Sequence, residues 1–152
     1  MASWVTWLLI VAGGVAGALQ APINTTLARH TGPIPASLVS FTVGALTMLV
    51  LTLFTLRGQG ISGLAGGIAA APPWSLVGGI CGAVVVTAVI VGTGSIGVNA
   101  TLSLLTGIQL IAALLIDAVG FGTVGPIPIR WPQVVGVLLM IVGMKLVLTR
   151  QP

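Results

Sequence analysis

The side chains that could carry out acid–base, nucleophilic or metal chemistry are few in this sequence. It holds one acid, Asp117, one histidine, His30, and one cysteine, Cys81, all far apart along the chain. General acid–base catalysis and metal binding require several such groups at one place, and a single cysteine excludes an intrachain disulfide. We therefore expect no enzymatic activity, no metal site and no cofactor. His30 falls in what we predict to be a solvated loop after the first helix.

The remaining polar groups are amides and hydroxyls, and the first of them share one helix face. Gln20 and Asn24 lie four residues apart, which places both side chains on the same side of a helix. Pro22 stands between them, lacks a backbone donor and so frees the carbonyl of Ala18. Such a carbonyl needs another partner, from protein, water or a ligand. Two amides and a freed carbonyl predict a neutral binding surface.

Two further polar stripes occur at helical spacing along later segments. The first comprises Ser37, Ser40, Phe41, Gly44 and Thr47, and the second comprises Asn99, Thr101, Ser103, Thr106 and Gln109. The residues that we predict to bind a small-molecule substrate are Gln20, Asn24, Ser40, Phe41 and Gln109. Phe41 would supply an apolar wall or a stacking face. The alternative is that these groups only join helices to one another, by hydrogen bonds worth about 0.6–2 kcal/mol each.

The elements that must position these residues follow from the near absence of charge. Hydrophobic residues make up 57% of the 152 residues, and charged residues make up only 4%. No charged side chain occurs between Gly58 and Ile116. A soluble domain cannot cover its surface with so few charges, whereas such an apolar surface is stable in hydrocarbon. The sequence therefore predicts a polytopic membrane protein.

A helix that crosses about 30 Å of hydrocarbon needs roughly 20 residues, and five such segments can be drawn. They span about 4–27, 35–56, 74–92, 96–119 and 131–148. The predicted fold is all-α, a single transmembrane domain over residues 1–152. Residues 58–71 are rich in glycine and alanine, and we expect them to lie along the membrane interface without forming a stable helix. Residues 120–130 contain Gly-Phe-Gly and Gly-Pro-Ile-Pro, which is typical of an ordered turn.

Five spans place the termini on opposite sides of the membrane, and the basic residues are divided almost evenly between the two sides. Those on the N-terminal side are Arg57 and Arg130, and those on the C-terminal side are Arg29, Lys145 and Arg150. This balance gives no orientation by the positive-inside rule, and single, scattered basic residues predict no nucleic-acid binding. The four tryptophans all map to the N-terminal side: Trp4, Trp7, Trp74 and Trp131. Because aromatic belts normally occupy both interfaces, an inverted second copy would supply the missing belt.

The only carboxylate, Asp117, should lie near the membrane surface. It stands 21 residues after Ile96, which corresponds to roughly 31 Å of helix rise, and Arg130 should emerge on the same side. We therefore expect Asp117 and Arg130 to form an interfacial ion pair or part of a gate. An exporter of permanent cations would be expected to hold a carboxylate near the bilayer centre. The sequence predicts a neutral or zwitterionic substrate instead.

A series of short motifs extends over nearly the whole chain: Gln20-x-x-x-Asn24-x-x-Leu27, Ser40-Phe41-x-x-Gly44, Pro73-Trp74, Gly78-Gly79-x-x-Gly82, Gly107-x-Gln109, Asp117-x-x-Gly120-Phe121-Gly122, and Arg130 with Gly136 and Gly143. In their order and spacing these motifs resemble the YdcZ-like branch of the drug/metabolite transporter superfamily. The resemblance implies a small, multi-pass inner-membrane protein with five helices, related to the small multidrug-resistance proteins, which work as dimers and are often antiparallel. Those exporters carry a glutamate in the first helix, whereas this chain has Gln20 there and no acid. Proton-coupled cation export therefore cannot be carried over.

The sequence as a whole predicts a small-molecule transporter that works by alternating access as an antiparallel homodimer surrounded by membrane lipid. Gly136 and Gly143 in the last helix would serve the contact between the two chains, and a paralogue could replace one protomer. The alternative from another functional class is a non-transporting membrane subunit that stabilises or regulates another integral protein. In that case Gln20, Asn24 and Gln109 would be paired with one another or with neighbours and would face no cavity.

Overall fold

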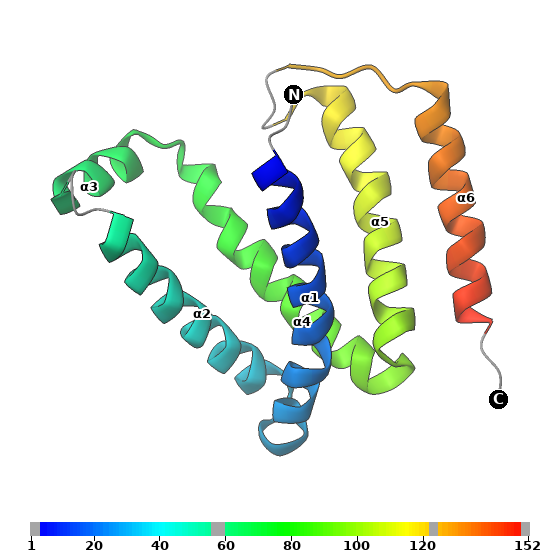
Figure 1. Cartoon of the computed structure of the whole chain (residues 1–152), viewed down its shortest axis with the longest axis horizontal. Coiled ribbons are helices and arrows are strands. Elements are labelled where there is room, and N and C mark those ends of the chain that lie inside the picture. The colour runs from blue at the N-terminus through cyan, green and yellow to red at the C-terminus, as the bar shows by residue number, and fades with distance from the viewer. Residues whose placement is uncertain (1–3, 56–59, 122–124, 150–152) are drawn as a thin grey trace. The chain divides into compact units, whose positions relative to one another are not determined.

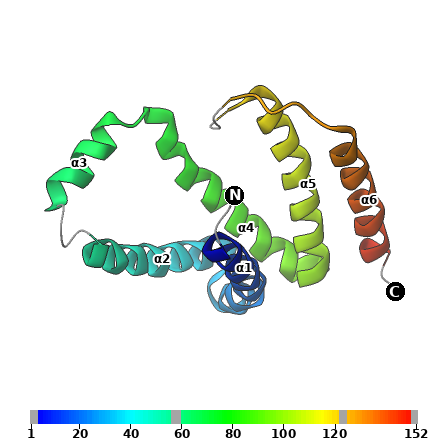
Figure 2. The same ribbon diagram turned by 45° about the horizontal axis from the view of Figure 1, so that its top comes forward.

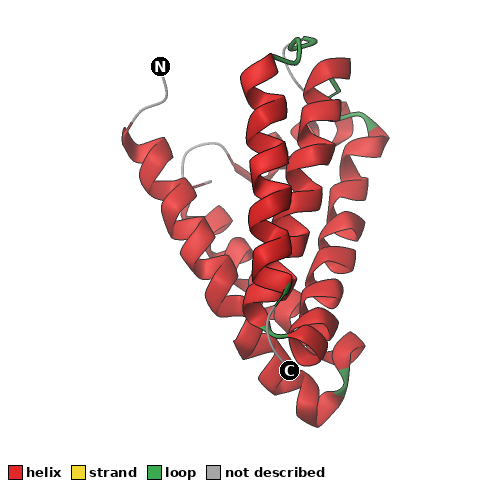
Figure 3. Cartoon of the chain, turned by 90° about the vertical axis from the view of Figure 1, so that its right-hand side faces the viewer, coloured by secondary structure: helices red, strands yellow, loops and turns green. Residues whose placement is uncertain are grey.

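The structure, a computed structural model, describes residues 4–55, 60–121 and 125–149, and in these ranges every regular element is helical. The elements are α1 (Trp4–Thr31), α2 (Pro33–Thr55), α3 (Gly60–Ala70), the short 3₁₀ helix η2 (Pro73–Val77), α4 (Gly78–Ile96), α5 (Val98–Val119) and α6 (Trp131–Leu148) (Figures 1 and 3). Within these described ranges, five helical segments are long and apolar enough to cross a membrane: α1, α2, η2 with α4, α5 and α6. This confirms the predicted all-α fold with five spans.

The first connection is much shorter than expected. α1 continues through Arg29 and His30 to Thr31, so the structure places His30 in the last helical turn and not in a loop. A single glycine, Gly32, then reverses the chain with a φ of 87°, a conformation that suits glycine. α2 starts directly at Pro33, where the missing backbone donor of proline does no harm in a first turn.

The glycine- and alanine-rich connection is also more ordered than expected. Residues Gly60–Ala70 form the helix α3, so the expectation that this stretch would not be helical was wrong. In an apolar setting a helix satisfies the backbone groups of such a segment internally, and this outweighs the low helix propensity of glycine. Two of the basic residues, Arg57 and Arg150, lie outside the described residues.

The chain divides into two compact units. The first comprises residues 1–18 and 92–152, and the second comprises residues 19–91. The division falls inside two helices, between Ala18 and Leu19 in α1 and between Val91 and Gly92 in α4. Both helices therefore belong partly to one unit and partly to the other.

In the second unit, α2 and α4 come together on the C-terminal half of α1 and spread apart toward α3 (Figure 2). The most deeply buried side chains here are two alanines, Ala21 of α1 and Ala36 of α2, which are both 0% exposed, and the larger Ile90 of α4, which is 2% exposed. Small side chains allow helix backbones to approach one another in a membrane. Thr25 supports this junction, because its Oγ1 donates to the carbonyl of Ala21 at 2.8 Å and approaches the carbonyl of Ile90 at 3.4 Å.

In the first unit, two glycines permit close contacts between neighbouring helices. A Cβ atom added to Gly92 would lie 2.6 Å from Thr101 Cγ2, and one added to Gly107 would lie 2.9 Å from the sulfur of Met144. The second contact packs α5 against α6. At its C-terminal end α5 closes with Gly120 in the left-handed conformation, its N–H donating to the carbonyl of Ile116 at 3.0 Å. The helix thus ends where the turn over residues 120–130 was predicted to begin, and residues 122–124 of that turn lie outside the described residues.

Candidate functional site

Three of the predicted binding residues line one hollow in the second unit. Gln20 of α1 and Ser40 and Phe41 of α2 are among the residues that line this open hollow of about 410 Å³. The remaining lining residues are Gly44, Ala45, Met48 and Val86. The wall thus combines one amide and one hydroxyl with apolar surface, and none of its lining residues is charged. A site of this kind suits a small ligand with polar groups and no net charge.

Asn24, the fourth predicted residue, supports this wall from behind. Its side chain is only 6% exposed, and its Nδ2 donates to Ser40 Oγ at 3.1 Å. Gln20, four residues earlier, is exposed at the hollow. Two amides on one helix face therefore have different environments: Asn24 holds the Ser40 hydroxyl in place, and Gln20 is available to a ligand.

Phe41 owes its position to a glycine on the facing helix. A Cβ atom added to Gly82 of α4 would lie 3.3 Å from Phe41 Cζ and 3.5 Å from Cε1, so the ring rests on the glycine backbone. Because Gly82 has no side chain, the ring can lie against α4 and leave the hollow open. Phe41 therefore lies on the wall of the hollow, and its contact with a substrate stays a prediction.

We expect Gly82→Leu to push the Phe41 ring into the hollow. Overpacking of this kind costs about 1–3 kcal/mol, so the unfolding temperature in detergent should fall and ligand binding should weaken. The matched control is Gly79→Leu on the same helix, since no atom lies within 4 Å of a Cβ added there. Equal losses of stability and binding in both variants would show that the contact between Gly82 and Phe41 does not shape the hollow.

Gln109, the fifth predicted residue, lies elsewhere. It is on α5 in the first unit, and its side chain is exposed. The other four predicted residues belong to the second unit. A contribution of Gln109 to the same substrate path stays a prediction.

Several residues around the hollow were not predicted from the sequence. Ala45 and Met48 follow Phe41 at helical spacing on α2, so a longer apolar stripe could have found them. Val86 gave no signal, because any residue of an apolar helix could have occupied that place. A hydrogen bond of 2.9 Å between Ser37 Oγ and Thr87 Oγ1 also joins α2 to α4. Helical spacing within each segment could not predict this contact, because it does not show which residues of two helices face each other.

The predicted gate residues lie at the turn between α5 and α6. Asp117 lines a second hollow, of about 500 Å³, together with Gln133 of α6. The backbone carbonyl of Asp117 accepts a hydrogen bond from Ile127 N–H at 2.8 Å, which holds the turn against the end of α5. Arg130 begins α6, where its N–H donates to Gln133 Oε1 at 2.8 Å and its carbonyl accepts from Gln133 N–H at 2.9 Å. An ion pair or a gate formed by Asp117 and Arg130 stays a prediction.

Comparison with known proteins gives the chain its family. The family model described as "Putative inner membrane exporter, YdcZ" matches residues 5–146. The inner membrane protein YdcZ of Escherichia coli (strain K12) is 29% identical over 148 residues, which cover 95% of this chain and 95% of that protein. No solved structure shows a significant match. Together with the five apolar helices, these findings confirm the predicted resemblance and localisation: the chain belongs to the YdcZ family of drug/metabolite transporters and is a multi-pass membrane transporter of the inner membrane.

Proposed function

We propose that this protein exports a neutral or zwitterionic polar molecule, which it binds at the hollow of Gln20, Ser40 and Phe41. The observation that supports the proposal is the composition of the wall, which offers an amide and a hydroxyl beside apolar surface and no charged side chain. An amide both donates and accepts hydrogen bonds, so it can bind a polar ligand without a counter-charge. A permanent cation would lose its hydration there and find no carboxylate in return.

We further propose that the working unit is an antiparallel homodimer. The basic residues give neither orientation an advantage, and the four tryptophans, all on one predicted side, are exposed in the structure: Trp4, Trp7, Trp74 and Trp131. A second, inverted chain would complete both aromatic belts. It would also close the open side of the hollow, and inversion would make the inward-open and outward-open states equivalent. A paralogous chain could take the place of one protomer.

The first experiment is a binding screen on the purified wild-type protein in detergent. Thermal unfolding is followed with glycine, alanine, glucose, glycerol and mannitol as neutral or zwitterionic probes, and with tetraphenylphosphonium and tetraethylammonium as cations. The proposal expects a concentration-dependent rise in unfolding temperature with one or more neutral or zwitterionic probes, because a ligand that binds the folded state stabilises it. A rise with the cations alone would contradict the proposed substrate class.

The orientation of the chains is tested separately in intact cells. Cys81 is replaced by serine, and a single cysteine is placed at Arg29 or at Arg57. If the dimer is antiparallel, each site should react with a membrane-impermeant maleimide from both sides of the membrane. Labelling of each site from one side only would exclude dual insertion and leave the substrate proposal standing.

A second candidate function is that of a non-transporting subunit that stabilises another membrane protein. The hydrogen bond between the buried Asn24 and the half-buried Ser40 supports it, since a polar contact of this kind can simply hold two helices together. The exposed Gln20 in an open hollow speaks against it. Failure of every probe in the binding screen, combined with stoichiometric copurification of one other integral protein, would favour this alternative.

A further inference from the structure

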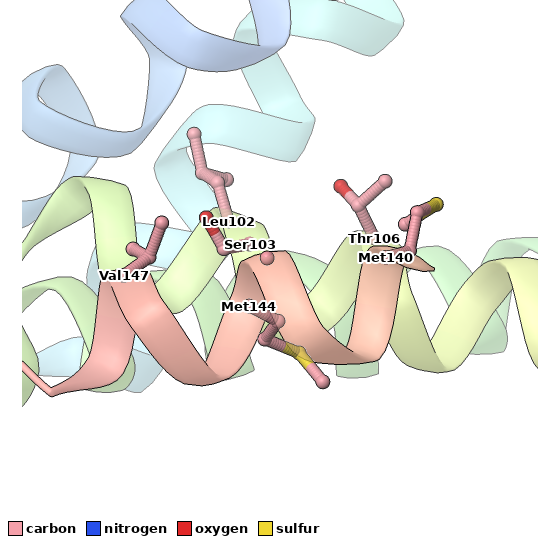
Figure 4. A pocket seen from close by; sticks show the side chains of 7 residues that line it. Leu102, Ser103, Thr106, Met140, Met144 and Val147 are labelled. Carbon is pink, nitrogen blue, oxygen red and sulfur yellow. The ribbon is translucent and has the colours of Figure 1, made fainter. Parts of the chain in front are cut away.

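A long groove runs along α5 and α6 in the first unit, separate from the hollow described above. Its upper part is the hollow of about 500 Å³ headed by Asp117, and its lower part encloses about 470 Å³. Met140 lines both parts, so they adjoin each other along α6 (Figure 4 shows the lower part). Apart from Asp117 and Gln133 at the head and Ser103 and Thr106 lower down, the lining residues are apolar.

The head of the groove has an acidic residue on its wall, and a basic residue begins the neighbouring helix. Asp117 lines the groove near the end of α5, and Arg130 precedes the first residue of α6. Trp131, next to Arg130, is 74% exposed, and tryptophan favours the interface between lipid headgroups and hydrocarbon. Groups of both charges and an interfacial aromatic residue therefore belong to the two helices that form the groove.

The two hollows together follow α5 from Ser103 to Asp117, about 21 Å of helix rise. This span exceeds the roughly 15 Å of half a hydrocarbon core, so an acyl chain from one leaflet is short enough to lie along it.

We propose that this groove binds one phospholipid whose headgroup carries a primary ammonium, such as phosphatidylethanolamine. The ammonium donates to the carboxylate of Asp117, the phosphate pairs with Arg130, and one acyl chain lies along α5 and α6. Gly136 and Gly143 leave room for that chain, because no atom lies within 4 Å of a Cβ added at either. This gives the two glycines a different role from the dimer contact that the sequence predicted.

The test is native mass spectrometry of the purified protein with equal amounts of phosphatidylethanolamine, phosphatidylcholine and phosphatidylglycerol of matched acyl chains. Phosphatidylcholine carries a quaternary ammonium that cannot donate a hydrogen bond. One charge-assisted hydrogen bond corresponds to about a tenfold difference in affinity, so we expect about a tenfold preference for phosphatidylethanolamine. Asp117→Asn should reduce this preference to nearly none, and Gly136→Leu should lower the binding of all three lipids by filling the groove.

Leu139→Ala is the control, since Leu139 is exposed on α6 and does not line the groove. Circular dichroism and gel filtration establish that each variant is folded. An unchanged lipid preference in Asp117→Asn, or unchanged binding in Gly136→Leu, would overturn the proposal. A second result would also overturn it. The double variant Gly136→Cys and Gly143→Cys is made in a background without Cys81, and formation of a disulfide between two chains is measured. In an antiparallel pair these two positions meet only if a second copy of the chain occupies the groove, so an interchain disulfide would exclude a lipid there.

Discussion

Replacement of Gln20 with leucine is expected to weaken substrate binding strongly while the protein stays folded. Gln20 offers the only amide on the wall of the hollow, and its side chain is exposed there, so the fold does not depend on it. A ligand group left without its partner costs about 1–3 kcal/mol, which corresponds to about a 5- to 150-fold loss of affinity. The measurement is the thermal shift given by the most stabilising neutral or zwitterionic probe, together with counterflow of that probe in proteoliposomes.

A companion variant, Gln20→Glu, tests the selectivity of the same position. It places a carboxylate of nearly the same shape in the hollow, where a cation can now find a counter-charge. We expect the neutral probe to bind more weakly and tetraphenylphosphonium to bind in its place. Gain of cation binding would show that Gln20 faces the ligand, which loss of binding in the leucine variant alone cannot show.

Gln109→Leu provides the matched change on α5. Weaker binding in this variant as well would extend the site to the first unit, as the sequence predicts. Unchanged binding would confine the site to the hollow of the second unit. If Gln20→Leu kept full affinity and full counterflow, the hollow would not be the binding site.

The fold could be predicted from the sequence because its main determinants are local. The scarcity of charge and the length of the apolar runs define five spans without any tertiary information, and the spacing of Gln20 and Asn24 places them on one face. The helix α3 was missed because glycine content argues against a helix in water, whereas an apolar setting favours internal hydrogen bonding. The single-residue turn at Gly32 was missed because two basic residues and a proline are also typical of a loop.

The site was harder to predict, because its details depend on how helices cross. Spacing alone treats Gln20 and Asn24 as equivalent, yet the approach of α2 buries Asn24 against Ser40 and leaves Gln20 exposed. In the same way, a glycine motif on α4 predicts a packing face but not its partner. Only the structure shows that the ring of Phe41 rests on Gly82. Periodicity selects candidate faces, and the crossing of helices decides which residues on them can meet a ligand.

Replacement of Pro22 with alanine is expected to stabilise the protein and slow transport. Pro22 lies within α1 and denies Ala18 its usual hydrogen-bond partner, and the division between the two units falls between Ala18 and Leu19. On α4 the same division falls next to Gly92, another residue that weakens a helix. If alternating access requires the units to move against each other, these two points are where the helices can bend.

Alanine at position 22 restores the donor and removes an interior proline, which costs about 3 kcal/mol relative to alanine. We expect a rise of several degrees in unfolding temperature and slower hydrogen exchange in peptides that cover residues 15–25. Counterflow should fall at least about tenfold with unchanged affinity for the probe, because movement and not binding is affected. The control is Gly79→Ala, which raises helix propensity on α4 where a Cβ meets open space and should stabilise the protein without slowing it. Transport at the wild-type rate in a stiffened Pro22→Ala protein would show that α1 does not bend at this point, and the motion would then have to be sought elsewhere in the two units.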